Sequence, residues 1–569
     1  MRKPKWRADR DRYRRGSATL ARVTVTRQQA SPHEASQEAS AQSQPTWGES
    51  VARELVRGHP TLVYANRPKC ITAVLDESRR WAGRPFIIQG ERTITFAEHE
   101  RMVATIATRL RSEGVRPGDT VAIFASNSPE WVATFFAVMA LGAIVVPCNG
   151  WWSAEEMEHA VLAVTPRLVV CDERRGQRVQ PNVRQLNLAT LAADATAAAE
   201  NADDLMMDVG EDSPAAILFT AGTTEFPKGV TLSHRALVAN LQTLLTVSRK
   251  LPHLISDDIA PSVTLVGLPL FHIGAIQLIL VPMITGSQIV FLEGRFDPDA
   301  VLRLMEGRGV TMFSGVPTMM QRLLAHPDVD RRDLSTVRTV VLGGSPVDTA
   351  LLEKVARAFP NTRRGVGQTY GLTEAGGVVS TGVGTQIRSH PGSSGKVAPV
   401  VEIQIDQPDD NGDGEILVRS PACMNGYWGL VDDEVINESG WLRTGDIGHL
   451  DDDNYLYVTG RSKDVIIRGG ENVAASRVES VLQSHPAVAE AAVVGLPDEE
   501  YGQIVGAAIR LRTQDLCGQA ELSAYAAQRL AQFAVPTQWW FFDSPLPTND
   551  SGKVLKSQIV SNWPAQNKL

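Results

Sequence analysis

The sequence predicts an α/β protein with a large N-terminal domain of two α/β lobes and a β-rich subdomain, followed by a small mobile α+β C-terminal domain. Three observations carry this prediction. The chain has 569 residues, too many for one compact core. Short apolar runs alternate with amphipathic helical stretches, as in parallel α/β layers. After Gly460 the sequence becomes charged and glycine-containing and leads into short βα units. We expect boundaries at 1–46, 47–460 and 461–569, with a hinge near Lys463.

Residues 1–46 show no apolar periodicity. An arginine-rich start is followed by a run of Gln, Ser and Ala, so we expect a disordered basic, low-complexity extension. An Arg- and Ser-rich start is also typical of transit peptides, but Asp9, Asp11, Glu34 and Glu38 disfavour that interpretation. A solvated extension or an upstream start codon is the preferred explanation.

The first lobe begins with a buried strand, "TVAIFAS" at 120–126. A helix follows, with Ser128 as its cap and Pro129 at its first position. The stretch "IVVPCN" is the next strand. A capping-box pattern, from Ser153 to Glu156, opens another helix, and "RLVVCD" is a strand again.

The second lobe repeats the scheme between residues 263 and 374, where strand-like stretches such as "QIVFLE" alternate with helical ones such as "DPDAVLRLMEGRG". A β-rich region surrounds "EIQIDQPDDNGDGEILVRS". We expect the run Asp451–Asp453 to form a solvated hairpin turn. Small βα units then fill residues 475–536.

Composition excludes several function classes. The net charge of −8 argues against a nucleic-acid surface. The five cysteines are scattered without a CxxC pair, which predicts a reducing compartment and neither a disulfide framework nor a zinc site. No apolar run reaches the ~20 residues that span a bilayer. We therefore expect a cytoplasmic protein without an integral membrane segment.

The stretch "FTAGTTEFPKGV" (219–230) has the composition of a phosphate-binding loop. It follows an apolar strand, its glycines permit unusual backbone geometry, its threonines supply hydroxyls, and Lys228 supplies a positive charge. The order Pro-Lys-Gly differs from a Walker A motif, which ends in Gly-Lys-Ser/Thr. The alternative is a polar surface turn. Glu225 is unexpected here, because a carboxylate facing phosphate would weaken nucleotide binding.

Five further stretches carry candidate residues, each with a plain structural alternative. His272 in "PLFHIGA" sits among apolar residues, where a core histidine is common. The pair of glycines in "VLGGSP" suits a flat ring or a tight turn. In "GQTYGLTE", Tyr370 can stack on a base and Glu374 can hold Mg²⁺. Asp446 can accept both ribose hydroxyls, as in dinucleotide sites. Lys553 follows Gly552 on a turn, where a surface lysine is ordinary.

In this order, the stretches together resemble the adenylate-forming superfamily, which contains acyl-CoA synthetases, aryl-CoA ligases, luciferases and amino-acid adenylation domains. The resemblance covers residues 47–569. It rests on "TAGTTEFPKGV", "PLFH", "GGSP", "QTYGLTE", "GWLRTGD", "GRSKDVIIRGGENV" and "SGKVLK".

The resemblance implies two half-reactions: ATP and Mg²⁺ convert a carboxylic acid into an acyl-adenylate, and coenzyme A then takes the acyl group. It implies catalytic roles for Lys553, Glu374, Lys228 and His272, and a metal role for Glu374. It implies CoA contacts at Gly469 and Gly470, and a hinge at Lys463. The ATP- and AMP-binding residues it implies are Thr220, Gly222, Thr223, Thr224, Lys228, Ser345, Thr369, Tyr370, Gly371, Thr373, Asp446 and Arg461.

The acid is expected to be hydrophobic. Amino-acid adenylation domains usually carry an aspartate just after the position of His272, whereas here Ile273 and Gly274 follow. A medium or long fatty acid, or a bulky alicyclic or steroid side-chain acid, is favoured. Fatty-acyl-AMP or aryl-acid ligation is the alternative. The partners expected are this acid, ATP and CoA, with no nucleic acid; a homodimer is left open.

The other interpretation is a non-catalytic relative that binds nucleotide or acyl ligand. Ala221 replaces the usual serine of the loop, Glu225 replaces a glycine, and Ala475 stands where relatives often have proline. We expect Glu225 to point away from phosphate. The charged residues that the chemistry requires are nevertheless present, which favours an enzyme.

Overall fold

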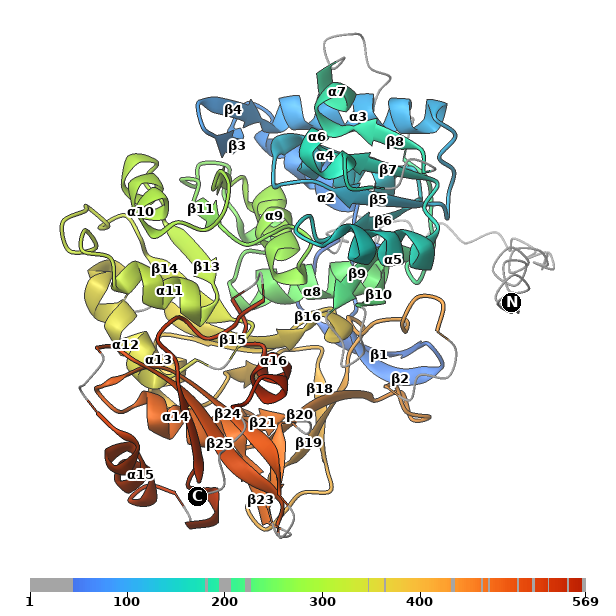
Figure 1. Cartoon of the computed structure of the whole chain (residues 1–569). Coiled ribbons are helices and arrows are strands. Elements are labelled where there is room, and N and C mark those ends of the chain that lie inside the picture. Colours follow the sequence, from blue (N-terminus) through green and yellow to red (C-terminus); the bar gives the residue numbers. More distant parts are fainter. Residues whose placement is uncertain are drawn as a thin grey trace, which may run out of the picture. The chain divides into compact units, whose positions relative to one another are not determined.

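The computed structural model describes residues 45–179, 183–193, 206–220, 227–345, 347–362, 365–430, 435–461, 464–468, 471–498, 501–513, 517–530, 532–549 and 552–564. From Thr46 onward the chain forms one compact unit. Nearly all of the predicted N-terminal extension lies outside the described residues. A β-hairpin, β1 (Val51–Val56) and β2 (His59–Tyr64), opens the described chain (Figure 1).

The first lobe is built on a six-stranded sheet in the order β10-β9-β6-β5-β7-β8. The strands are parallel except for the β9–β10 pair, which is antiparallel. Every residue of β5 is buried, so this strand lies in the core as its apolar sequence predicts. The strands are β5 (Thr120–Phe124), β6 (Ile144–Pro147), β7 (Leu168–Cys171), β8 (Gln185–Asn187), β9 (Pro214–Thr220) and β10 (Lys228–Ser233).

Two helices of this lobe begin at the predicted caps. Ser128 accepts a hydrogen bond from the Trp131 amide, and Ser153 and Glu156 form the predicted capping box. These contacts satisfy amide groups that a helix start leaves unpaired. The helices are α3 (Phe96–Ser112), α4 (Pro129–Ala140), α5 (Ala154–Val164), α6 (Glu173–Gly176) and α7 (Leu188–Ala193).

The second lobe has a nine-stranded sheet in the order β17-β16-β15-β14-β13-β11-β12-β3-β4, green to yellow in Figure 1 apart from its blue N-terminal strands β3 and β4. Its central strands are parallel and its two edges antiparallel. The strands are β3 (Pro85–Gln89), β4 (Arg92–Thr95), β11 (Val263–Val266), β12 (Gln288–Phe291), β13 (Met312–Gly315), β14 (Thr339–Gly343), β15 (Val366–Leu372), β16 (Gly377–Val383) and β17 (Lys396–Val397).

The apolar stretch 278–285 lies in helix α9, which is buried along most of its length and contains Pro282. The helical segments flanking this sheet in sequence are α2 (Ala73–Ser78), η3 (Arg79–Trp81), α8 (His234–Val247), η5 (Pro252–Leu254), α9 (Ile273–Thr285), α10 (Pro298–Gly307), α11 (Pro317–Leu324), α12 (Thr349–Ala358), η6 (Pro360–Thr362), η7 (Thr373–Ala375) and α13 (Thr385–Ser389).

The predicted β-rich region is a four-stranded antiparallel sheet of β18 (Glu402–Asp406), β19 (Gly414–Arg419), β20 (Leu442–Leu450) and β21 (Leu456–Arg461). The turn between the last two strands is the predicted solvated hairpin. There Asp451 accepts hydrogen bonds from the Asp453 and Tyr455 amides, and Asn454 adopts a positive φ of 62°.

The small C-terminal domain has its own sheet, in the order β23-β22-β25-β24, with β26 added to β25. Two apolar clusters lie within it, one of which packs α14 and α15 against the sheet. Its elements are β22 (Val465–Arg468), β23 (Glu471–Ala474), α14 (Ala475–Gln483), β24 (Val488–Asp498), β25 (Gly502–Leu511), α15 (Gln519–Ala527), η8 (Gln532–Ala534), β26 (Gln538–Phe541) and α16 (Lys556–Ser561).

The predicted fold class is therefore confirmed: two α/β lobes and a β-rich sheet precede a small α+β domain. All five cysteines are free thiols. Among the described residues, no helix combines the length and the apolar character that crossing a membrane requires.

Candidate active site

The two ends of the candidate phosphate loop are held by one β-ladder. Thr220 ends β9 and Lys228 begins β10, and the two residues are register partners. The antiparallel pairing therefore closes the intervening loop and brings a hydroxyl and an ammonium group to its base. The loop residues Gly222, Thr223 and Thr224, together with Ala221 and Glu225, lie outside the described residues.

Glu374 lies at this base, because the short helix η7 follows directly after strand β15. The Thr220 hydroxyl donates to Glu374 Oε1 over 3.0 Å, and the Tyr427 hydroxyl donates to the same oxygen over 3.1 Å. Lys228 Nζ lies 4.8 Å from the centre of the Tyr427 ring. Two hydroxyls thus hold one oxygen of the Glu374 carboxylate, a side chain of the type that binds hard cations.

A second polar centre joins β15 to the β-rich sheet. The Tyr370 hydroxyl donates to Asp446 Oδ2 over 2.7 Å, and Arg461 Nε donates to Asp446 Oδ1 over 2.7 Å. Asp446 and Arg461 are register partners on β20 and β21. The Asp446 side chain is only 3% exposed, whereas that of Arg461 is 51% exposed, so a buried carboxylate meets a cation at the surface. Burial, and then the Asp446 charge, raise the pKa of Tyr370 well above its usual value, so its hydroxyl remains a donor.

The glycines near Tyr370 allow backbones to approach closely. A Cβ on Gly371 would lie 1.9 Å from the Gly377 carbonyl oxygen, where the β15–β16 register shifts. A Cβ on Gly343 would lie 2.7 Å from Thr369 Cγ2. Ser345 follows these glycines and is half-buried. A side chain at Gly343 or Gly371 would therefore force the neighbouring strand apart.

Lys553 lies on a tight turn in which Asn549 accepts from the Lys553 amide over 2.8 Å and Gly552 has φ of 81°. Although this side chain retains access to solvent, desolvation and then the Arg461 charge lower its pKa, while Asp464 and Asp446 oppose that shift. The ammonium group therefore shares the electrostatic environment of the Asp446–Arg461 pair.

His272 is the residue before helix α9 and is half-buried beside Phe271, with the ring centres 4.4 Å apart. The Phe271 ring meets Trp151 edge-on at 5.6 Å. Burial lowers the pKa of His272 to about 4, so its imidazole is neutral near pH 7. The structure thus places His272 beside one aromatic ring, that of Phe271; the hydrogen bonds that it describes do not join His272 to Glu374 or Asp446.

The structure groups the predicted residues into two polar centres. Thr220, Lys228 and Glu374 lie in one, while Tyr370, Asp446 and Arg461 form the other, whose charges act on Lys553. Lys463, Gly469 and Gly470 lie outside the described residues. Sequence reasoning missed Tyr427, which sits in "MNGYWG" without a charged or hydroxyl-rich context to mark it.

Comparison with known proteins agrees with this geometry. Residues 75–428 match the AMP-binding enzyme family, and residues 477–553 match the AMP-binding enzyme C-terminal domain. The chain therefore belongs to the AMP-binding enzyme family and is an adenylate-forming acid–thiol ligase of the acyl-CoA synthetase type.

A feruloyl-CoA synthase from Amycolatopsis sp is 35% identical over 83% of this chain and 94% of its own length. A fatty acid–[acyl-carrier-protein] ligase from Streptomyces coeruleorubidus is 32% identical over 84% of this chain and 92% of its own. The solved structure of o-succinylbenzoate CoA synthetase from Bacillus subtilis, in complex with its acyl-adenylate intermediate, superposes with a TM-score of 0.74. It is 30% identical and covers 87% of this chain and 99% of that one.

Proposed function

We propose that the protein activates a hydrophobic carboxylic acid with ATP and transfers the acyl group to coenzyme A. One observation carries the proposal: Tyr370 and Arg461 each donate to one oxygen of the buried Asp446 carboxylate, which orients a hydrogen-bond acceptor for a ribose. Lys553, whose charge interacts with this pair, is proposed to offset the repulsion between an anionic acid and an anionic nucleotide.

In the first step, a carboxylate oxygen attacks the α-phosphorus of ATP, the bond to pyrophosphate breaks, and an acyl-adenylate forms. Asp446 and Arg461 hold the ribose, Tyr370 and Gly371 frame the adenine with Ser345 and Thr369, and Thr373 contacts phosphate. Lys553 binds the reacting carboxylate, and the loop from Thr220 to Lys228 binds the phosphates. Mg²⁺, held by Glu374, would neutralise phosphate charge.

In the second step, the CoA sulfur attacks the acyl carbon and AMP leaves. Lys553 must move away before the thiol enters, so we propose that the domain after residue 460 rotates about Lys463 and brings Gly469 and Gly470 to the thiol channel. This gating keeps water out of each step.

The acyl tail is proposed to be uncharged and apolar. Ile273, which follows His272, is buried, and Phe271, which precedes His272, packs edge-on against Trp151. No carboxylate follows His272 to hold an amine. A medium or long fatty acid, or an alicyclic acid, fits this apolar environment. The aromatic edges and the similarity to a feruloyl-CoA synthase favour an aryl acid as the second candidate.

The test is a CoA-dependent screen of short, long, alicyclic and aromatic acids, with product mass measured and acid-dependent ATP–pyrophosphate exchange run in parallel. A thioester with one hydrophobic class is the expected result. Exchange without thioester would indicate an acyl-AMP ligase. No exchange with any acid would identify a non-catalytic binding protein and overturn the proposal.

A further inference from the structure

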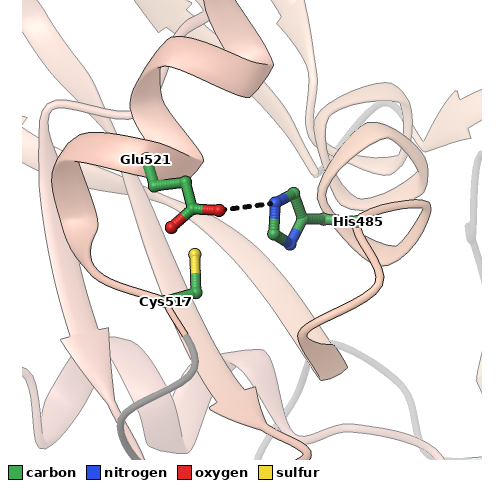
Figure 2. Close-up of side chains that lie close together, drawn as sticks. All are labelled: His485, Cys517 and Glu521. Atoms are coloured by element: carbon green, nitrogen blue, oxygen red, sulfur yellow. Dashed lines mark ion pairs between the residues drawn. The ribbon is translucent and has the colours of Figure 1, made fainter.

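Three side chains in the C-terminal domain converge outside the proposed active site (Figure 2). His485 follows helix α14, Cys517 precedes helix α15, and Glu521 lies in the first turn of α15. One nitrogen, one sulfur and one oxygen from these residues all lie within 4.8 Å of one another. The cysteine pattern alone predicted no zinc site, because the histidine comes from a distant part of the sequence.

The spacing suits a bound cation. His485 Nε2 lies 3.6 Å from Glu521 Oε1. Two ligands that each lie about 2.0–2.2 Å from a tetrahedral Zn²⁺ are separated by roughly 3.5 Å, so this pair already has the separation that zinc requires. The Cys517 sulfur lies within 4.8 Å of both atoms.

The chemistry of the three donors also matches zinc. Imidazole, thiolate and carboxylate are the three side-chain types that bind Zn²⁺, and a borderline-soft ion accepts all of them. A thiolate and a carboxylate carry two negative charges, which neutralise a divalent ion. The His485 side chain is 10% exposed and that of Glu521 is 60% exposed, so the site has a buried side and an open side through which an ion can enter.

Two contacts must change when an ion binds. The Cys517 thiol donates to the Gly518 carbonyl over 3.7 Å, and it loses its proton on becoming a ligand. Nδ1 of His485 lies 3.3 Å from the Ala487 amide nitrogen, and this long contact is lost when the ring proton moves from Nε2 to Nδ1. The Ala487 amide then loses its acceptor, which costs about 5–150-fold in affinity and weakens the site without closing it.

We propose that His485, Cys517 and Glu521 bind one Zn²⁺, with water as the fourth ligand, and that the ion ties the end of α14 to the start of α15. The α14–α15 contact already exists without it, through the Ser484 and Tyr525 hydroxyls, 3.1 Å apart, and the edge-on packing of His485 on Tyr525. The ion therefore reinforces an α14–α15 contact that has already formed. None of its three ligands is among the residues assigned to catalysis.

The experiment titrates Co²⁺, and then competing Zn²⁺, into the full-length, untagged chain after chelator treatment and dialysis. The expected result is one metal ion per chain by elemental analysis, with a thiolate-to-cobalt charge-transfer band that Zn²⁺ abolishes. Cys517→Ser should remove the band and weaken Zn²⁺ binding at least tenfold. Glu521→Gln, which keeps the helix and the thiol, should retain the band and weaken binding severalfold.

The matched control is Cys70→Ser. Cys70 is also a half-buried thiol beside a histidine, with Sγ 3.2 Å from His234 Nδ1, but among the described residues it belongs to no group of three metal-binding side chains. This variant should bind metal as the wild type does. Absence of the charge-transfer band in the wild type, or equal binding by the wild type and Glu521→Gln, would overturn the proposal. Thermal melts without metal identify any variant whose fold has changed.

Discussion

The Tyr370 hydroxyl donates to Asp446 Oδ2 over 2.7 Å and thereby links the nine-stranded sheet of the second lobe to the four-stranded β-rich sheet. The strands that carry these residues, β15 and β20, are separated by about seventy positions in the sequence. Because Arg461 holds the other oxygen of the same carboxylate, both acceptor atoms of Asp446 are oriented before any nucleotide binds.

Asp446→Asn should raise the KM for ATP by about 10–100-fold, because a hydrogen bond to a charged group contributes about 1.5–3 kcal/mol. Tyr370→Phe keeps the ring and removes only the hydroxyl, so the KM for ATP should rise less, by about 3–10-fold. Steady-state kinetics at saturating acid and CoA measure both. A Tyr370→Phe defect equal to that of Asp446→Asn would contradict the assignment of Asp446 as the ribose contact.

Lys553→Ala should reduce acyl-adenylate formation by about 10²–10³-fold, the usual loss when one charge-stabilising group is removed from an active site. Thioester formation from pre-made adenylate should fall far less, because Lys553 is proposed to have left by then. Pyrophosphate exchange and single-turnover thioester assays separate the two. The control is Lys556→Ala: Lys556 pairs with Asp464 and Glu479 and should affect stability rather than the chemical step.

The adenylation rate should fall on the alkaline side at a lower pH than an ordinary lysine would give. Only the protonated ammonium offsets negative charge, and the pKa of Lys553 is lowered, so the active form is lost earlier as pH rises. Pre-steady-state adenylation measured against pH tests this. In Lys553→Arg the alkaline decline should move to higher pH, because a guanidinium stays charged. If the alkaline decline occurs at the same pH in Lys553→Arg as in the wild type, the decline belongs to another group.

Glu374→Gln should raise the Mg²⁺ concentration needed for half-maximal adenylation by about 10–100-fold, since an amide is a much weaker ligand for a hard cation. Thr220→Val and Tyr427→Phe each leave one hydroxyl on Oε1, so each should shift the requirement only severalfold. The double variant, Thr220→Val with Tyr427→Phe, should need more Mg²⁺ for half-maximal adenylation than either single variant. Magnesium titrations of all four proteins provide the measurement, and an unchanged requirement in Glu374→Gln would remove this residue from metal binding.

Acid should destabilise the fold partly through His99. This side chain is 1% exposed and packs edge-on against Phe86 and Phe136, and burial lowers its pKa to about 3. Its folded pKa lies below the unfolded value of about 6.5, so the stabilisation is complete above pH 6.5 and declines as pH falls toward 3. At pH 5 the loss amounts to about 2 kcal/mol.

His99→Phe should therefore reduce the stability difference between pH 7.5 and pH 5 by about that amount. Urea unfolding at the two pH values, followed by tryptophan fluorescence, gives the comparison. His253→Phe is the control, because the His253 side chain is exposed in the short helix η5. An unchanged difference in His99→Phe would mean that His99 is not protonated on unfolding in this range.

Local patterns in the sequence were sufficient for much of this molecule. The Ser153–Glu156 capping box and the cap at Ser128 were visible as short-range hydrogen-bonding patterns. The stretch "GQTYGLTE", which forms strand β15 and helix η7, was recognisable by composition. Such features depend on residues a few positions apart, and these the sequence displays directly.

Contacts between distant segments could not be predicted from those local patterns. Tyr427 reaches Glu374 because an isolated bridge between Val230 and Tyr427 holds its segment against β10. His485 meets Cys517 because α14 and α15 pack on one sheet. In both cases the partner is chosen by tertiary packing, so neither residue carried a local pattern that could have identified it.

The position of Arg461 has a mechanical consequence. It is the last residue of β21, two positions before Lys463, and it is held by the β20 ladder and by its ion pair with the buried Asp446. Any rotation of the following domain must change backbone dihedrals after Arg461, because β21 itself is held by its pairing with β20. Asp446 and Arg461, which are proposed to hold the ribose, would then also fix the point about which the domain turns, so that nucleotide binding would stiffen that point.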